Sequence, residues 1–404
     1  MRLGFDTTQT IDRRYILDRQ LGKGGMGAVY EAFDRLSGET VALKLVLSPP
    51  GDLDFASKGG GLDLNMALAQ EFKTLASLRH PNIISVLNYG FDKTNRPYFT
   101  MDLLDNALSP ARAVWGKPDA YKVDMLIQIL QALSYLHRRD IIHRDLKPAN
   151  VRVVKEQVKV LDFGLSTLKS KQQEEDSDKI VGTIEYMAPE LLRQHPPSIE
   201  TDLYAVGVVG WELFTGEYLF DATDIRKVAQ EIFHKIPDPA EVGNDRVGLV
   251  LARLLSKEPE NRYRSADETI AALCAAIDIP LPPESVAIRE SFLQAATLVG
   301  REREIDLFSE KLQEARAGRG SGWLIAGESG VGKSRLLDEI RVRALVDGAI
   351  VVRGEAISTG RSPYQIWREV IRNLILGANI DRREAGILQP VIPDIDKLLE
   401  IKPA

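Results

Sequence analysis

The pattern of apolar and polar residues divides the chain into a strand-rich beginning and a helical continuation. Residues 28–33 and 41–44 read as short strands, and the serine-glycine pair at 37–38 predicts a turn between them. Further along, residues 123–137 and 202–215 carry apolar side chains at helical spacing. This order predicts a small sheet-rich lobe followed by a larger helical lobe, an α+β arrangement.

A proline-rich segment separates this part from a second block. Residues 278–285 contain three prolines within four positions, which stiffen the backbone and remove hydrogen-bond donors. Beyond it, residues 323–326 read as a strand and residues 335–346 as a helix, the start of an α/β domain. We therefore predict one domain at 15–277, a linker at 278–295, and the N-terminal part of a second, truncated domain at 296–404.

Composition argues against several classes of function. The net charge of -6, with no strongly basic half, argues against a nucleic-acid partner. No apolar stretch reaches the about 18 residues that a membrane segment needs. The first residues lack the apolar core of a signal peptide, and the single cysteine, Cys274, fits a reducing compartment. We expect a cytoplasmic location.

The most specific motif is the octapeptide His143–Asn150, which lies about a dozen residues before Asp162-Phe163-Gly164. Asp145 is placed to accept a proton from a hydroxyl, and Lys147 to neutralise a moving phosphoryl group. Asn150 and Asp162 are the residue types that hold Mg²⁺ in this pattern. The motif is that of the catalytic loop of a protein kinase.

A glycine-rich segment supplies a candidate phosphate-binding loop. Its glycines are Gly22, Gly24, Gly25 and Gly27. A dinucleotide-binding turn has similar spacing, but it requires a helix directly after the glycines. Here a strand-like hairpin follows and ends at Lys44, which we expect to contact the α- and β-phosphates of ATP. Glu71, on a predicted helix at 66–78, is the expected partner of Lys44.

With these motifs, residues 15–277 resemble the bacterial serine/threonine protein kinases of the eukaryotic type. Residues 182–190, residues 202–207 and Arg262 strengthen the resemblance. It implies the two-lobed protein kinase fold, with ATP and Mg²⁺ in the cleft, and transfer of the γ-phosphoryl group to serine or threonine hydroxyls of proteins. The catalytic set that it implies is Lys44, Glu71, Asp145, Lys147, Asn150, Asp162 and Thr183.

The resemblance also implies further roles. Thr183 would bond Lys147 and mark the serine/threonine class. Glu190 would pair with Arg262, and Asp202 would brace the catalytic loop. The adenine would be bound by four side chains and by the backbone of two further residues: Leu21, Val29, Ala42, Met101, Asp102 and Leu104.

The second block carries a Walker A motif. Its required positions are Gly327, Gly332, Lys333 and Ser334, and Gly330 within the loop is a further candidate binding residue. Lys333 would reach the β- and γ-phosphates and Ser334 would bind Mg²⁺. The preceding residues 299–302 resemble the beginning of the AAA-like ATPase modules of bacterial signalling proteins. No Walker B aspartate follows Ser334, so we expect little ATP hydrolysis at this motif.

Three interpretations of function follow. We prefer an active kinase that self-associates and autophosphorylates within a multidomain bacterial signalling protein. A pseudokinase scaffold is the second, and it predicts damaged catalytic positions, of which the sequence shows none. In the third, the ATPase is the effector and the kinase regulates it.

Overall fold

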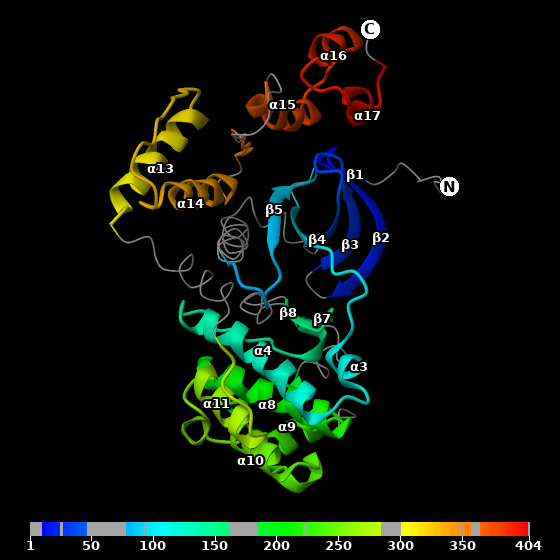
Figure 1. Ribbon diagram of the computed structural model, residues 1–404, viewed down its shortest axis with the longest axis vertical. Helices are drawn as coiled ribbons and strands as arrows, with labels where there is room; N and C mark the ends of the chain where they lie inside the picture. The colour runs from blue at the N-terminus through cyan, green and yellow to red at the C-terminus, as the bar shows by residue number, and fades with distance from the viewer. Residues whose placement is uncertain are drawn as a thin grey trace. The chain divides into compact units, whose positions relative to one another are not determined.

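The computed structural model describes residues 10–24, 27–46, 78–92, 94, 96–161, 184–220, 224–283, 300–346, 349–354, 356 and 364–402. Their contacts divide the chain into two compact units (Figure 1). The first unit draws on the ranges 1–77, 85–103 and 297–404, and the second on 78–84 and 104–296.

A six-stranded antiparallel sheet forms the frame of the first unit, with the strand order β1-β2-β3-β4-β6-β5. The strands are β1 (Thr10–Ile11), β2 (Tyr15–Gly24), β3 (Gly27–Asp34), β4 (Thr40–Val46), β5 (Val86–Phe91) and β6 (Pro97–Asp102). Tyr15, Leu43 and Tyr98 are almost completely buried in its core. The predicted strands at 28–33 and 41–44 are confirmed as β3 and β4.

The second unit is mostly helical. Its helices are α3 (Pro110–Val114), α4 (Asp119–His137), α7 (Pro189–Leu192), α8 (Ile199–Thr215), α9 (Ile225–His234), α10 (Asp245–Leu254) and α11 (Ala266–Ala276), with the short 3-10 turns η2 (Pro148–Asn150), η3 (Pro239–Val242) and η4 (Pro259–Asn261). The predicted helices at 123–137 and 202–215 are confirmed as α4 and α8. Both begin earlier than predicted, because their first turns carry polar residues that an apolar pattern does not mark.

A two-stranded ribbon lies beside the catalytic motif in the second unit. Strands β7 (Val151–Val154) and β8 (Gln157–Val160) pair in antiparallel fashion directly after η2. Val151, Val158 and Val160 are fully buried, which anchors the ribbon. The end of the catalytic motif is therefore held by a packed ribbon.

The C-terminal block contains α13 (Glu302–Arg316), α14 (Lys333–Val346), α15 (Gln365–Gly377), α16 (Arg382–Leu388) and α17 (Ile395–Leu399). Helix α14 confirms the helix predicted at 335–346. The strand predicted at 323–326 is wrong, since it pairs with no other strand among the described residues. A strand forms only where a neighbour satisfies its backbone groups, and an apolar run alone does not supply one.

Across the described ranges, no helix combines the length and the apolar character needed to span a membrane. The sheet and helical units together confirm the α+β class that the sequence predicts.

Candidate active site

Two polar residues of the catalytic motif, Lys147 and Asn150, donate hydrogen bonds to Asp145. Lys147 Nζ donates to Asp145 Oδ1 at 3.1 Å. Asn150 Nδ2 donates both to the Asp145 carbonyl oxygen at 2.7 Å and to Asp145 Oδ2 at 3.1 Å. Because both carboxylate oxygens are held, the Asp145 side chain has a defined direction. The side chains of Lys147 and Asp145 keep 16% and 11% exposure, so the pair is open to solvent.

The backbone of the motif is held from behind by Asp202, which α8 buries to 1% exposure. Asp202 Oδ2 accepts from the backbone N–H of His143 at 2.8 Å, and Oδ1 accepts from that of Arg144 at 2.9 Å. Arg144 has a φ of +68°, a conformation that costs free energy for a residue with a side chain. The two hydrogen bonds offset that cost, which confirms the predicted brace.

The ring of His137 also contacts the Asp202 carboxylate, and the sequence did not point to this residue. His137 Nε2 lies 2.8 Å from Asp202 Oδ2, at the last residue of α4. The His143 ring contacts the Leu161 carbonyl oxygen through Nε2 at 3.2 Å. His143 thus serves packing and hydrogen bonding, while His137 links α4 to the brace. The signal that could have found His137 is its place in the last turn of a helix that precedes the motif.

A buried ion pair joins Glu190 to Arg262, as predicted. The two guanidinium nitrogens donate to the two carboxylate oxygens at 2.7 and 2.8 Å, and the Arg262 side chain is fully buried. Arg262 also donates to the carbonyl oxygens of Ser256 at 2.8 Å and Glu200 at 2.9 Å. Burial acts to raise the pKa of the Glu190 carboxyl, but the hydrogen bonds from Arg262 outweigh it and hold that pKa below its usual value.

A second carboxylate near the motif has the opposite shift. Tyr186 Oη donates to both oxygens of Glu212, at 2.9 and 3.1 Å. Burial raises the pKa of Glu212 to about 7, against the hydrogen bond from Tyr186, and nearby Glu185 adds to the rise. Tyr186 also lines a small cavity together with Arg144 and Asp145. The sequence analysis did not single out this pair.

In the first unit, the sheet register brings four predicted ATP-binding side chains to one face. Val29 is paired with Lys44 between β3 and β4, and Ala42 is paired with Met101 between β4 and β6. Directly paired residues share a face, and so do residues two apart on a strand. Lys44 is buried to 6% exposure, and its Nζ lies 5.7 Å from the centre of the Phe99 ring.

The glycine-rich segment forms the tip of the β2–β3 hairpin, where Gly24 is paired with Gly27 and Gly22 with Val29. A Cβ atom at Gly27 would lie 2.2 Å from the Leu45 carbonyl oxygen, so only glycine fits there. Leu21, beside these glycines on β2, is 42% exposed. The hairpin predicted after these glycines is confirmed as β3–β4, in which Val29 is paired with Lys44.

Four predicted site residues, Gly25, Glu71, Asp162 and Thr183, lie outside the described residues. Asp102 ends β6, where it is paired with Val41 of β4, and its N–H donates to the Ser85 carbonyl oxygen at 3.3 Å. Leu104 follows in the second unit.

Among the described residues, no cluster of three or more His, Cys, Asp or Glu side chains forms a metal site. For Asn150, the donation to Asp145 directs its amide nitrogen inward, so its side-chain oxygen is the atom that would take a cation.

The Walker A residues form an exposed loop at the start of α14. Gly330 and Gly332 have φ values of +86° and +88°, which glycine adopts without strain. Lys333 Nζ donates to the carbonyl oxygens of Gly327 at 2.9 Å and Glu328 at 2.7 Å. The lysine thus folds back over its own loop, and Ser334, the predicted Mg²⁺ ligand, is exposed at the helix start.

Comparison with known proteins gives two family matches. A protein kinase domain model matches residues 15–273, and an AAA ATPase domain model matches residues 297–401. Together they imply the use of ATP.

Several curated proteins are similar to this chain. A probable serine/threonine-protein kinase of Clostridium acetobutylicum is 30% identical over 271 residues, which cover 65% of this chain and 40% of that protein. The serine/threonine-protein kinase PknA of Mycobacterium tuberculosis is 32% identical over 289 residues, 68% of this chain and 65% of PknA. Pkn1 of Myxococcus xanthus, also a serine/threonine-protein kinase, is 36% identical over 284 residues, 66% of this chain and 38% of Pkn1. The chain thus matches 38% to 65% of the length of these relatives.

Proposed function

We propose that this chain transfers the γ-phosphoryl group of ATP to serine or threonine hydroxyls of proteins. The chain belongs to the protein kinase family, whose domain model matches residues 15–273. The observation that carries this proposal is the orientation of Asp145. Lys147 and Asn150 hold its two carboxylate oxygens at 3.1 Å each, and the loop behind is fixed by buried Asp202. A carboxylate fixed in this way can accept a hydroxyl hydrogen bond in one direction.

In the proposed reaction, Asp145 accepts a hydrogen bond from the substrate hydroxyl and takes its proton as the oxygen attacks the γ-phosphorus; the bond from the γ-phosphorus to the bridging oxygen breaks, and ADP leaves. Lys147, 3.1 Å from Asp145, supplies positive charge where the phosphoryl group is transferred. Asn150 orients Asp145 and, with Asp162, would hold Mg²⁺, which neutralises phosphate charge when bound. Thr183 would support Lys147 and mark the serine/threonine class.

ATP binding is assigned to the face of the sheet that carries Val29, Ala42, Lys44 and Met101. The shared register of these residues supports the assignment. We also assign Leu21, the glycines at 22, 24, 25 and 27, and the backbone of Asp102 and Leu104 to this site, with Glu71 as the partner of Lys44. A kinase domain at 15–277, a linker at 278–295 and an ATPase part at 296–404 complete the proposed organisation, consistent with the matched ranges.

The P-loop at Gly327, Gly330, Gly332, Lys333 and Ser334 is proposed as a second nucleotide site with little hydrolysis. The start of α14 supports it, because helix N-termini with free N–H groups favour phosphate. We further propose protein substrates, autophosphorylation between copies of the chain, and a cytoplasmic location without a nucleic-acid partner.

Replacement of Asp145 tests the proposal. Asp145→Asn removes the proton acceptor but no proposed phosphate ligand, so phosphotransfer should fall by about 10²- to 10⁴-fold while ATP binding persists. Asp140→Asn is the matched control, because Asp140 is exposed in the same loop and its φ of +58° suits asparagine. Transfer of radiolabelled phosphate to protein, with mapping of the modified residues, measures both. Near-normal transfer by Asp145→Asn would refute the proposed function.

A further inference from the structure

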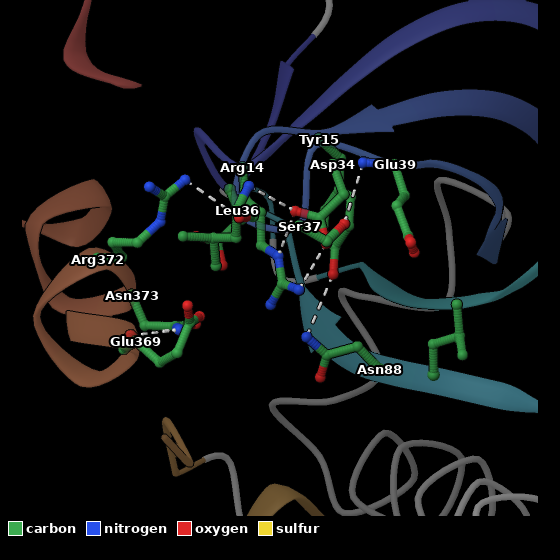
Figure 2. A network of polar contacts seen from close by, with 12 residues as sticks. Arg14, Tyr15, Asp34, Leu36, Ser37, Glu39, Asn88, Glu369, Arg372 and Asn373 are labelled. Atoms are coloured by element: carbon green, nitrogen blue, oxygen red, sulfur yellow. Dashed lines mark hydrogen bonds and ion pairs between the residues drawn. The ribbon is translucent and has the colours of Figure 1, made fainter. Parts of the chain in front are cut away.

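The turn between β3 and β4 is built around the buried carboxylate of Asp34. Arg14 donates to Asp34 through two nitrogens, Nε to Oδ1 at 2.8 Å and Nη2 to Oδ2 at 2.7 Å. The N–H of Leu36 donates to Asp34 Oδ1 at 3.0 Å, and that of Gly38 donates to the Asp34 carbonyl oxygen at 2.8 Å. Figure 2 shows this network beside the helix that carries Arg372. The turn therefore presents Leu36 in a fixed position.

Leu36 is only 9% exposed, although it occupies a turn at the end of a hairpin. It is buried in a hydrophobic cluster whose other buried members, among the described residues, all come from the C-terminal block: Ile375, Leu376, Ala385, Ile392, Ile395 and Leu398. These residues belong to α15, α16, α17 and the segment before α17. Leu36 is thus the contribution of the sheet to a core that the C-terminal helices form.

Polar contacts surround this apolar contact. Arg372, on α15, donates through Nη2 to the Leu36 carbonyl oxygen at 3.2 Å (Figure 2). Its Nη1 lies 2.7 Å from both oxygens of Asp394. From the other side, Arg35 Nη2 donates to the Leu398 carbonyl oxygen at 2.5 Å and to Glu400 Oε1 at 3.0 Å. Arg372 thus donates to a carbonyl of the turn, and Arg35 of the turn donates to a carbonyl of α17. Because these hydrogen bonds are directional, they favour one docked geometry.

The position of this turn in the sheet gives the contact a consequence. Leu36 links β3, which carries Gly27 and Val29, to β4, which carries Ala42 and Lys44. The turn lies at the opposite end of β3 and β4 from the glycine-rich segment. The helices α15–α17 therefore contact the end of these strands that is far from the glycines. We infer that the β3–β4 turn is a docking site for residues 365–401 of the same chain, and that this docking steadies the hairpin that binds ATP in the kinase reaction. The second half of this inference rests on the proposed function.

The docking is tested by placing a carboxylate in the turn of the full chain. Leu36→Asp puts a charge in the apolar cluster and should release the helices. Ser37→Asp is the matched control, because Ser37 is exposed and the new carboxylate can replace its hydroxyl as acceptor for the Glu39 N–H. We expect amide hydrogen exchange across residues 382–399 to accelerate at least about tenfold in Leu36→Asp and to stay within about twofold in Ser37→Asp. Unchanged exchange in Leu36→Asp would overturn the docking.

The effect on the kinase is read from the KM for ATP in phosphotransfer. Leu36→Asp should raise this KM by at least about threefold with a smaller change in kcat, because the change lies outside the reacting atoms. Equal KM values for the two variants, with accelerated exchange at 382–399, would overturn the steadying role. Leu36→Ala serves where Leu36→Asp does not fold, and should shift both readouts in the same direction. A wild-type chain without phosphotransfer would refute the proposed function, while hydrogen exchange would still decide the docking.

Discussion

The catalytic loop and the P-loop both carry complete sequence motifs, but their surroundings differ. Asp145 is held by two neighbouring side chains, and the backbone before it is held by Asp202, which is 1% exposed. In the P-loop, Lys333 donates to two carbonyl groups of its own loop, and Ser334 is exposed. The motif residues define which ligand can bind, whereas buried residues behind them fix the geometry in which they bind it.

The difference has a physical origin in the elements that carry each motif. The catalytic loop lies between α4 and the paired strands β7 and β8, whose buried valines fix it. The P-loop follows residues 323–326, which pair with no strand among the described residues, and Leu324 there is 92% exposed. Among the described residues, no paired strand therefore lies behind this P-loop to orient its glycines and lysine.

The largest expected contrast in stability concerns two ion pairs. Arg262→Ala leaves the carboxylate of Glu190 buried without its partner and should lower the free energy of unfolding by about 3–5 kcal/mol. Arg353→Ala removes an exposed pair of the C-terminal block, in which Arg353 Nη1 lies 3.5 Å from Asp338 Oδ1, and should cost less than about 1 kcal/mol. Urea denaturation of both variants measures the two costs. Equal losses of unfolding free energy in the two variants would show that the buried ion pair contributes no more to stability than the exposed one.

A smaller effect should appear as a pH dependence. The folded-state pKa of Glu212 is raised to about 7 by burial, so the folded chain binds this proton more tightly than the unfolded chain does. The contribution to stability is complete below the unfolded pKa of about 4.5 and is lost as pH rises through about 7, a change of up to about 3 kcal/mol. Glu212→Gln should lose this dependence and be more stable than wild type at about pH 8. Denaturation at pH 5 and pH 8 checks it, and the same pH slope in both proteins would contradict the assignment.

Much of the fold was predictable because local pattern and packing agree. The periodic apolar residues of α4 and α8 are largely buried, so their spacing indicates both the element and its inner face. The prediction of a strand at 323–326 failed, because strand formation depends on partners elsewhere in the chain, which a local apolar run does not reveal. The docking of Leu36 against α15–α17 was also out of reach, since no local pattern connects residues more than three hundred positions apart.

The site was predictable where short motifs carry the chemistry. The spacing of Asp145, Lys147 and Asn150 places all three on one loop, and their hydrogen bonds follow from that proximity. His137 and Glu212 escaped prediction for a different reason. Each lies on a helix whose pattern indicates packing, and only the tertiary fold brings them to Asp202 and Tyr186.

The central claim is that phosphotransfer in this chain depends on Asp145 and not on the P-loop. ATP turnover by wild type, Asp145→Asn, Lys333→Ala and the double variant tests it directly. We predict that Asp145→Asn removes nearly all turnover, and that Lys333→Ala changes neither wild type nor Asp145→Asn, because its contacts are local to the P-loop. Substantial turnover in Asp145→Asn that disappears in the double variant would contradict the claim and would show a working ATPase at the P-loop.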